Sequence, residues 1–553
     1  MASNSFSTEA LPGAASGAPS LDRPALDVPP NPIGRLLFIL TIIGGLGFAG
    51  YSIASETAQV GETLALATII LLGVALIIAL GFEFVNGFHD TANAVATVIY
   101  TNSMTAPVAV VWSGFFNFLG VMLSSGAVAY SIVTLLPVEL ILNIGSAAGF
   151  AMIFALLIAA VLWNLATWFV GLPNSSSHAL IGSILGVGLA NQILSAGAGA
   201  TSGVNWGKAQ EVLTGLALAP LIGFGTALLL LLIMKRVLRN PKLYTKPEGN
   251  APPPRGIRAL LIFTCTAVSF AHGGNDGQKG MGLIMLILIG CAPTAYALNR
   301  GPDVNAPAFV QQATTAASVF AGHAGSAAVP LGTAREILAS ALKTKSANDP
   351  VVFAAIDTVS RQIASTVSGY GSLANVPSAA TSRLRNDLYL VLDTSKLVTK
   401  GKNVHATFSD PELKTIADFQ KGMEASTRFI PLWVKIAVAV ALGLGTMVGW
   451  KRIVITVGEK IGKSHLTYGM GASAELTAAT MILAADAFAL PVSTTHILSS
   501  GVAGASVASG AGLQMRTILN MALAWLLTLP AVMALAGGLY WVGLSVIRAM
   551  GAA

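Results

Sequence analysis

The chain has 553 residues, of which 54% are hydrophobic and only 10% are charged. Soluble domains carry about 25% charged residues, so this composition excludes an ordinary soluble protein. The net charge of +7 does not indicate nucleic-acid binding, because no basic stretch is interleaved with aromatic residues. The two cysteines, Cys265 and Cys291, lie in apolar segments and predict neither a disulfide framework nor a metal site.

The first 33 residues are rich in proline, alanine, glycine and serine, which predicts a disordered tail at 1–33 and not a signal peptide. A first membrane domain is expected at 34–234. Six apolar runs in the chain approach or exceed the ~20 residues that cross a bilayer. They cover residues 36–53, 64–81, 150–170, 213–234, 433–449 and 518–546. The predicted fold class is therefore an all-α polytopic membrane protein.

A basic connection at 235–258 follows the first membrane domain. Its only acid is Glu248, and its basic residues are Lys235, Arg236, Arg239, Lys242, Lys246, Arg255 and Arg258. The positive-inside rule predicts that this linker is cytoplasmic. Membrane segments then resume at 259–298. They are interrupted by a hydrophilic insertion at 299–429, whose side of the membrane stays open, and they continue at 430–550.

Two pairs of similar motifs divide the chain into halves. In the first half, the motif regions are 81–105 and 171–190, and HDTANA begins at His89 and PNSSSH at Pro173. In the second half, the regions are 270–282 and 490–505, and NDGQKG begins at Asn275 and PVSTTH at Pro491. The order is the same in both copies. Duplicated halves are a common plan of secondary transporters, whose substrate site lies between the repeats near the bilayer midplane.

The Asn/Asp motifs place carboxylates inside apolar segments. An ionised carboxylate at membrane depth is costly unless it is paired or faces water. Asp90 and Asp276 are therefore candidates for cation or proton coordination. Neighbouring glycines would let the backbone leave helical geometry and expose carbonyls. The alternative is a polar contact between helices, or a loop outside the membrane.

The Pro/Ser/Thr motifs have the composition of helix starts, because proline fits the first turn and hydroxyls cap free amides. A helix N-terminus attracts anions. Two such starts facing each other would form a hydroxyl-rich cage for a tetrahedral oxyanion. The candidate phosphate-contacting hydroxyls are Ser175, Ser176, Ser177, Ser493, Thr494 and Thr495. The alternative is ordinary capping of two membrane helices.

A divalent anion beside Asp90 and Asp276 would be repelled unless cations neutralise the cluster. Sodium, protons, a divalent metal or Lys279 would supply that charge, so the motifs predict a symporter better than a passive pore. His89, His272 and Glu83 are further candidates for proton coupling, since histidine titrates near physiological pH.

Five stretches resemble the inorganic phosphate transporter (PiT) family, in particular its bacterial low-affinity, proton-coupled members. They are NGFHDTANAVATVIYTNSM, LPNSSSHALIGSILGVGLAN, FAHGGNDGQKGMGLIMLILIG, GWKRIVITVGEKIGK and LPVSTTHILSSGVAG. The resemblance implies two inverted repeats with broken helices and re-entrant hairpins around a central site. It places the six hydroxyls at phosphate-facing hairpin tips. It places Asp90, Asn93, Asn275 and Asp276 in the cation- and phosphate-coordinating motif.

Two departures from that family bear on the coupling ion. Sodium-coupled members typically carry an Asn-Asp-x-x-Asn-Ala pattern in both copies. Here His89 replaces the leading asparagine of the first copy, and Lys279 replaces the trailing asparagine of the second. An ammonium group cannot coordinate sodium, so both changes favour proton coupling.

We expect a symporter that imports inorganic phosphate across the cytoplasmic (inner) membrane of a bacterium, with protons and as a complex with Mg²⁺ or another divalent metal. Alternatives are a sulfate or other oxyanion permease, a sodium-coupled phosphate symporter and an ion channel. A membrane phosphoester enzyme is disfavoured, because sequence neighbours such as Ser175 and His178 are not expected to aim at each other and no orienting acid is apparent. No resident cofactor and no nucleic-acid partner are expected. Membrane lipid is a partner, and a homo-oligomer stays open.

Overall fold

We describe the protein from a computed structural model of the full chain. The structure describes residues 24–26, 31–136, 141–142, 145–195, 204–249, 251–301, 306–401 and 404–550, without the side chains of 91–93 and 195. Most of the predicted tail at 1–33 therefore lies outside the described residues. The side chain of Asn93 lies outside them as well.

The described residues are helical apart from their connections and one isolated β-bridge between Gly462 and Leu513. The first half contains α1 (Pro32–Gln59), α2 (Leu66–Tyr100), α3 (Ala106–Leu123), α4 (Ala127–Val133), α6 (Ala147–Phe169), α7 (Ser176–Ser195), α8 (Trp206–Val237) and η1 (Pro241–Tyr244). The second half contains α9 (Arg255–Cys291), α10 (Pro293–Tyr296), α17 (Leu432–Thr446), α18 (Lys451–Glu459), α19 (Tyr468–Ala487), α20 (Thr494–Ser509) and α21 (Met515–Ala549). The helices run a few residues into the predicted linker, so the connection between α8 and α9 is 238–254.

Eight of the described helices are long and apolar enough to cross a membrane. The number of spans rises to nine if the helix Asp410–Thr427 and α17, which meet at an angle of 70°, together count as one span. Large apolar side chains also cover the outside of the bundle, as at Leu221 on α8 and Leu526 on α21, which are 69% and 71% exposed. Such a surface is unfavourable in water and favourable against lipid chains. These observations confirm the predicted polytopic all-α class.

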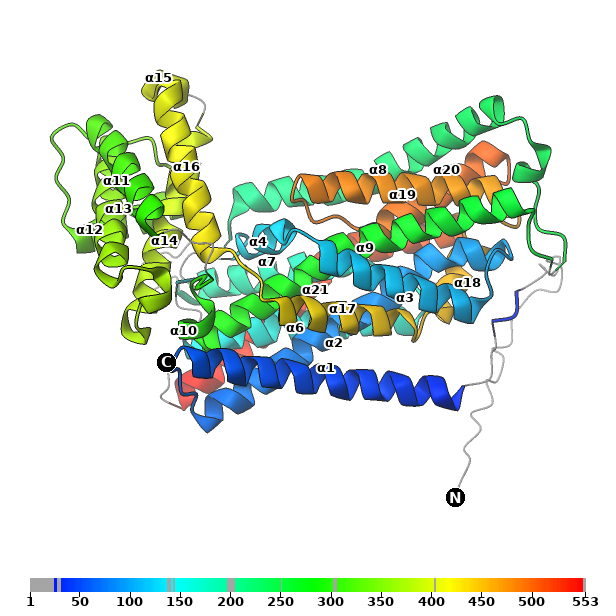
Figure 1. The fold of residues 1–553 in the computed structure, drawn as a ribbon. Helices are drawn as coiled ribbons and strands as arrows, with labels where there is room; N and C mark the ends of the chain where they lie inside the picture. Colours follow the sequence, from blue (N-terminus) through cyan, green and yellow to red (C-terminus); the bar gives the residue numbers. More distant parts are fainter. Residues whose placement is uncertain are drawn as a thin grey trace.

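Both Asn/Asp motifs lie inside uninterrupted helices. Helix α2 is continuous from Leu66 to Tyr100, and α9 is continuous from Arg255 to Cys291. At 1.5 Å per residue each is roughly 50 Å long, more than the hydrocarbon thickness of a bilayer. Figure 1 shows α9 extending along the whole membrane body. The expectation that the glycines break the helices at these motifs is therefore wrong.

The motif glycines instead allow helices to pack backbone against backbone. A Cβ on Gly273 of α9 would lie 2.1 Å from the carbonyl oxygen of Asn117 on α3. The corresponding glycine of the first half, Gly87 on α2, would place a Cβ 2.3 Å from the carbonyl oxygen of Leu442 on α17. Real Cβ atoms do not approach this closely, so only glycine fits at both crossings. The two halves use the same motif position for the same packing.

Two adjacent glycines test this packing. Gly273→Ala is expected to force α3 away from α9 and to destabilise the protein by about 1–3 kcal/mol, the usual cost of overpacking. Gly274→Ala is the matched control, because its Cβ would lie 3.7 Å from the nearest backbone oxygen, an ordinary contact. Melting temperatures in detergent would measure the difference. Equal melting temperatures for the two variants would contradict the close crossing.

Two helical hairpins bring the Pro/Ser/Thr motifs together. The tip between α6 and α7 meets the tip between α19 and α20, where the Ser177 hydroxyl donates to the Val492 carbonyl at 2.7 Å. The outer ends of the hairpins lie at opposite ends of α9. The segment leading into α6 packs at Gly290 near the end of α9, and α19 packs at Leu261 near its start. The hairpins therefore approach the centre from opposite sides.

The packing partners of the helices exchange between the two halves. Helix α3 packs on α9, and its counterpart α17 packs on α2. In the same way, α7 packs on α21 and α20 packs on α8. Helices α2 and α9 cross each other at the centre. This exchange is the pattern that two equivalent halves, each completed by the other, would produce.

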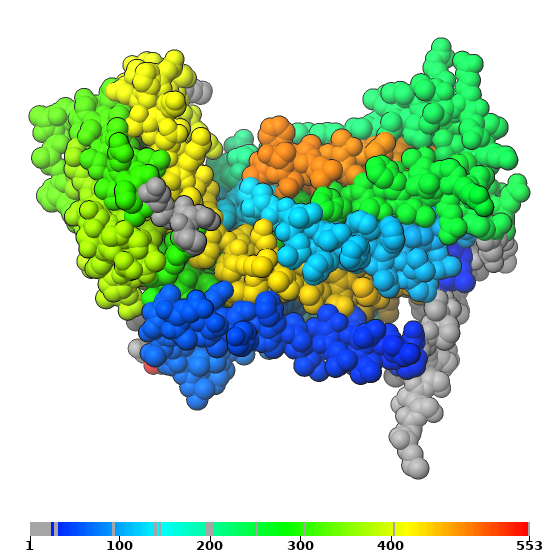
Figure 2. Space-filling model, in the orientation of Figure 1, coloured from blue at the N-terminus to red at the C-terminus, as the bar shows by residue number. Residues whose placement is uncertain are grey.

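The hydrophilic insertion is a separate helical bundle at one end of the membrane body (Figures 1 and 2). It contains α11 (Ala306–His323), α12 (Leu331–Thr344), α13 (Pro350–Tyr370), η2 (Leu373–Asn375), α14 (Ser378–Thr399), α15 (Val404–Thr407) and α16 (Asp410–Thr427). Its helices enclose an apolar core of their own, to which Phe320, Phe353 and Phe408 contribute. The hydroxyl of Ser409, the N-cap residue of α16, lowers the pKa of Glu412 to about 2 by donating to its carboxylate.

Candidate functional site

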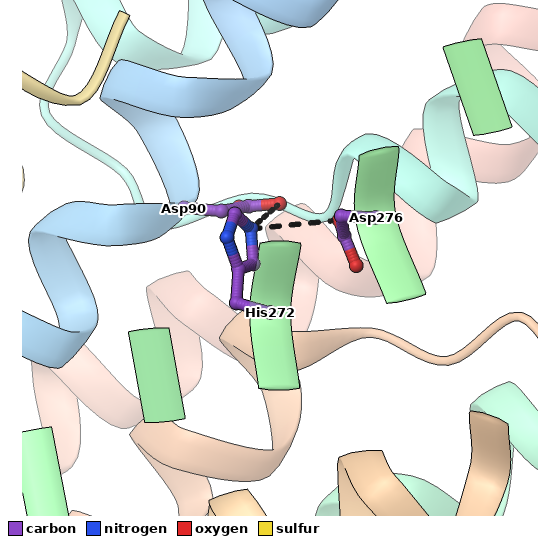
Figure 3. Close-up of side chains that lie close together, drawn as sticks. All are labelled: Asp90, His272 and Asp276. Carbon is purple, nitrogen blue, oxygen red and sulfur yellow. Dashed lines mark ion pairs between the residues drawn. The ribbon is translucent and has the colours of Figure 1, made fainter. Parts of the chain in front are cut away.

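Three buried side chains meet where α2 and α9 cross (Figure 3). Asp90 comes from α2, and His272 and Asp276 lie one turn apart on α9. Nε2 of His272 lies 4.0 Å from Oδ2 of Asp90 and 3.7 Å from Oδ2 of Asp276. One ligand atom from each residue falls within 4.8 Å of the other two. The two carboxylates, one predicted from each half of the chain, therefore share one site.

Lys279 is the cation of this cluster. Its Nζ lies 2.7 Å from Oδ2 of Asp276, and it donates to the Ser177 hydroxyl at 2.5 Å. It also reaches the Val492 carbonyl at 3.5 Å. The side chain is fully buried. A buried ammonium needs this number of acceptors to offset the loss of water. Lys279 thus connects the α9 carboxylate to both hairpin tips.

Three of the six predicted hydroxyls face the Asp90 carboxylate or the small cavity beside it. Ser176 donates to Oδ2 of Asp90 at 2.7 Å and approaches Asp276 at 3.4 Å. Thr495 donates to Oδ1 of Asp90. Thr494 lines the cavity, and its hydroxyl has no hydrogen-bond partner among the described residues. One hydroxyl from the α6–α7 hairpin and two from the α19–α20 hairpin therefore surround the same carboxylate region.

Two other hydroxyls cap the hairpin helices. Ser175 accepts a hydrogen bond from the backbone N–H of His178 at 3.2 Å, and Ser493 accepts one from that of His496 at 3.2 Å. The predicted helix starts are therefore confirmed. Ser175 and Ser493 also use part of their hydrogen-bonding capacity on the backbone, which leaves less for a ligand.

The Ser175 hydroxyl also lies 2.9 Å from Nδ1 of His178. The expectation that these sequence neighbours do not aim at each other is therefore wrong. The physical reason is the helix start itself, since the N-cap residue and the third helical residue lie side by side, as in a capping box. The His178 ring contacts the ring of His496 in a tilted arrangement, with 4.3 Å between centroids. No acidic partner of His178 is found among the described residues that would orient it as a catalytic base.

The other predicted residues surround this centre. Asn275 donates to the Leu490 carbonyl at 3.1 Å and thereby binds a hairpin tip, not the cavity. Nδ1 of His89 lies 3.6 Å from Oδ1 of Asp90. Glu83 accepts a hydrogen bond from Asn86 at 3.4 Å and packs against Gly280, next to Lys279. The structure thus groups most of the predicted residues in one buried region.

Several polar atoms of the site have no hydrogen-bond partner among the described residues. They include Nε2 of His272, Oδ1 of Asp276, Oγ1 of Thr494 and Oε1 of Glu83. Buried polar atoms are nearly always satisfied in proteins, so a cluster of exceptions indicates a ligand or ion. The cavity at this point measures only about 10 Å³, roughly the space of one water molecule. This conformation is therefore closed around the site, and a larger ligand requires the hairpin tips to separate.

The donors of this site suit a divalent cation. Asp90 and Asp276 supply hard carboxylate oxygens, and His272 supplies an imidazole nitrogen that lies between them. Magnesium and manganese prefer oxygen ligands, and imidazole suits several transition metals. With Lys279 charged, the two ionised carboxylates leave the cluster with one net negative charge. An incoming anion therefore requires additional cations.

Sequence reasoning missed two side chains that hold the site together. Oδ1 of Asn117 on α3 lies 2.6 Å from Nδ1 of His272, which orients the imidazole. Oδ1 of Asp486 accepts from Gln278 at 2.6 Å and ties α9 to the end of α19. Both are single polar residues in apolar segments, and such residues mark functional positions in membrane helices. They lie outside the duplicated motifs, so the comparison of halves did not reveal them.

Comparisons with known proteins agree with this description. The family profile described as "Phosphate transporter family" matches residues 86–536. The low-affinity inorganic phosphate transporter PitA of Escherichia coli (strain K12) is 40% identical over 503 residues, covering 86% of this chain and 97% of that protein. PitB of the same strain is 39% identical over 499 residues, with the same coverage. A probable low-affinity inorganic phosphate transporter of Bacillus subtilis (strain 168) is 28% identical over 463 residues, covering 84% of this chain and 94% of that protein.

One solved structure is also similar. It is described as "The sodium-dependent phosphate transporter", is 20% identical in sequence and has a TM-score of 0.47. The match covers 86% of this chain and all of that one.

Proposed function

This chain belongs to the phosphate transporter family, whose substrate is phosphate, and we propose that it imports inorganic phosphate by proton symport, as a complex with a divalent metal. The observation that carries the proposal is the joint placement of Asp90, His272 and Asp276 beside hydroxyls of both hairpin tips. The carboxylates bind the metal, Nε2 of His272 holds the coupled proton, and the hydroxyls donate to the phosphate oxygens. The membrane is the cytoplasmic membrane of a bacterium.

The charge of the site supports co-transport of cations. Phosphate carries up to two negative charges near neutral pH, and the cluster already carries one with Lys279 included. A divalent metal cancels the charge of the phosphate dianion. One proton on His272, which turns its imidazole into a cation, then cancels the remaining charge of the cluster. Moving a neutral assembly avoids the large cost of a net charge at membrane depth.

The position of Lys279 favours protons over sodium. Its ammonium group occupies the space beside Asp276 where a coordinated cation would otherwise balance the carboxylate. An ammonium has only donors and cannot bind sodium. The proposed coupling proton therefore titrates elsewhere in the site. Nε2 of His272, which has no hydrogen-bond partner among the described residues, is the candidate.

Transport requires the hairpin tips to move relative to α9. Three contacts hold them in place here: Lys279 to Ser177, Ser177 to the Val492 carbonyl, and Asn275 to the Leu490 carbonyl. In the proposed cycle, phosphate oxygens replace these partners of Lys279 and Ser177. The hairpin tip on the side from which phosphate entered then closes, and the hairpin tip on the opposite side opens. The opposite approach directions of the two hairpins give the site access to each side in turn.

Uptake of labelled phosphate into proteoliposomes tests the proposal. An external medium that is more acidic than the liposome interior, and Mg²⁺ in that medium, are expected to stimulate uptake. A sodium gradient at constant pH is expected to have no effect. Collapsing the pH gradient with a protonophore should abolish accumulation. Uptake that requires sodium and ignores pH would overturn proton coupling. Full competition by excess sulfate would favour the oxyanion permease instead.

A further inference from the structure

The tip of the α6–α7 hairpin begins with the capped end of a helix. Helix α6 ends at Phe169, and Gly171 follows in the left-handed conformation, with φ of +71°. The Gly171 N–H donates to the Trp168 carbonyl at 2.9 Å, and the Leu172 N–H donates to the Thr167 carbonyl at 3.0 Å. This is the Schellman arrangement, in which glycine suits the left-handed position. The carbonyls of Phe169 and Gly171 do not take part in this cap and accept from other donors.

Helix α18 supplies those donors. The Arg452 guanidinium donates to the Phe169 carbonyl, and the Thr456 hydroxyl, one turn further along α18, donates to the Gly171 carbonyl at 2.8 Å. The end of a helix carries partial negative charge, so a cation there is favourable, and hydrogen bonds from a charged donor are stronger than neutral ones. Helix α18 therefore completes the cap of α6 from a distant part of the chain.

The Trp168 side chain adds a second connection between the hairpin tip and α18. Its indole N–H donates to the carbonyl of Gly449, two residues before α18 begins, at 2.8 Å. The guanidinium carbon of Arg452 lies 5.0 Å from the centre of the Trp168 ring, which is a cation–π contact. The same ring packs edge-on against Phe88 of α2, with 5.2 Å between centroids. The tip is thus held by α18 and α2 together.

Helix α18 follows α2 from the level of the site to the end of α2. The segment before α18 contacts Phe88, two residues before Asp90, since a Cβ on Gly449 would lie 3.2 Å from the Phe88 ring. Near the other end of α18, a Cβ on Gly458 would lie 2.2 Å from the ring of Tyr100, the last residue of α2. The hairpin tip that α18 holds therefore lies between the site and that end of the membrane body.

That end of the membrane body is assigned to the cytoplasm. Asn102, which follows α2, donates to the carbonyl of Gly249 in the connection 238–254 at 2.8 Å. The connection therefore lies at the same end. Its excess of basic residues makes this end cytoplasmic by the positive-inside rule. The α6–α7 tip then covers the site on its cytoplasmic side.

The α19–α20 tip is held by different residues. Asn275 donates to its Leu490 carbonyl, and Gln278 donates to Asp486 at the end of α19. Both lie on α9, the helix that carries His272, so a ligand at the site acts on these contacts directly. The contacts of the α6–α7 tip come from α18, a different helix. Alternating access requires one side to stay closed while the other exchanges its ligand. Contacts on a separate helix provide such closure.

We propose that α18 is the latch of the cytoplasmic gate, in which Arg452 and Thr456 are positioning residues that hold the α6–α7 tip closed. The inference rests on the proposed function for the direction of transport. It deepens that function by naming the contacts that release to the cytoplasm must break. Exchange of phosphate on the outer side leaves the latch intact. Release to the cytoplasm requires the tip to leave α18, and water then replaces the two side-chain donors.

A weakened latch is expected to change the apparent affinity for phosphate in opposite directions on the two sides. Arg452→Gln/Thr456→Val removes the cation and the hydroxyl, and should favour the state that is open to the cytoplasm. The KM for phosphate should rise roughly three-fold in right-side-out membrane vesicles and fall roughly three-fold in inside-out vesicles, because apparent affinity scales with the fraction of the competent state. Loss of folded protein would lower the maximal rate on both sides without changing KM. Unchanged KM values, or shifts in the same direction, overturn the proposal.

Two control variants make this test specific to the latch. Thr456→Ser keeps the hydroxyl that donates to Gly171 and should retain the wild-type KM on both sides. Arg516→Gln/Thr517→Val removes the same chemical groups from the start of α21, and it should also retain the wild-type KM. A shift in either control as large as that of the latch variant overturns the proposal.

A disulfide tests the same contact in the opposite sense. A Cβ on Gly171 would lie 3.9 Å from Cβ of Arg452, and disulfides join Cβ atoms about 3.5–4.5 Å apart. Oxidised Gly171→Cys/Arg452→Cys is expected to lose phosphate uptake, and a reductant should restore it. Both forms share the strain of a side chain at position 171, so the comparison isolates the cross-link. Each single cysteine variant should keep its uptake in the same oxidant. Failure to cross-link, or uptake by the cross-linked protein at the rate of its reduced form, overturns the proposal.

A third experiment does not depend on transport. Leu172→Cys, at a half-buried position of the tip, is labelled with a membrane-impermeant maleimide in inside-out vesicles, after Cys265→Ala and Cys291→Ala remove the native thiols. Adding Arg452→Gln/Thr456→Val should accelerate labelling several-fold. Equal rates, or labelling only from the outer side, overturn the latch even if the protein transports phosphate. Faster labelling in a protein that shows no uptake would support the latch while the proposed symport failed.

Discussion

Asp90→Asn is expected to lower the initial rate of phosphate uptake by about 100-fold, the upper end of the effect seen when a partner of a metal site is lost. Asp90 accepts hydrogen bonds from Ser176 of one hairpin and Thr495 of the other, and it lies 4.0 Å from His272. The amide keeps the size of the side chain but removes the negative charge. The site then loses a charged ligand for the metal and one of the two oxygens that accept from the hydroxyls.

The control for this variant is Asp387→Asn. Asp387 is also a buried carboxylate, and it forms two hydrogen bonds of 2.7 Å with Arg335 inside the insertion. Its loss should affect the stability of the insertion while leaving the KM for phosphate near that of the wild type. Uptake by Asp90→Asn at the wild-type rate, with the same dependence on Mg²⁺ and pH, would exclude Asp90 from the transport site.

Lys279→Met is expected to destabilise the protein by about 3–5 kcal/mol, because it leaves the buried Asp276 carboxylate without its ammonium partner. The double variant Lys279→Met/Asp276→Asn should recover most of this loss, since both members of the pair become neutral. Neither variant should transport phosphate with protons. A melting assay with a thiol-reactive dye would follow unfolding through the buried Cys265 and Cys291.

The double variant makes this prediction specific to the pair. Lys460→Met serves as the control, because Lys460 is exposed at the end of α18. This variant should have the melting temperature of the wild type. If the double variant is no more stable than Lys279→Met, the pair does not account for the loss. Recovered stability together with wild-type uptake would show that the pair is only structural.

The chemistry of the site was predictable where residue type alone constrains its use. A carboxylate such as Asp90 or Asp276 cannot lie in an apolar segment without a partner, so its presence there indicates a site. The duplication then added a second, independent signal. Asn117 and Asp486 have the same chemistry but no counterpart in the other half, so they gave only the weak signal of a single polar residue.

The glycines and the Ser175–His178 contact show where sequence reasoning failed. Glycine has both conformational freedom and small size, and a single sequence does not reveal which property is used. The carbonyls of Asn117 and Leu442, on other helices, show that size is used at Gly273 and Gly87. The Ser175–His178 contact likewise arises because a helix begins between the two residues, which places their side chains on one side.

The sequence by itself determined that the protein is a polytopic membrane protein with two related halves, a hydroxyl motif and a carboxylate motif in each, and one basic end. These properties follow from local composition, because transfer of each segment to a bilayer depends mainly on its own residues. Only the tertiary structure decided which hydroxyls reach Asp90, that α2 and α9 continue through the site, and that the insertion is a helical bundle with an apolar core of its own. These features depend on contacts between residues hundreds of positions apart, which are set by helix packing and not by local hydropathy.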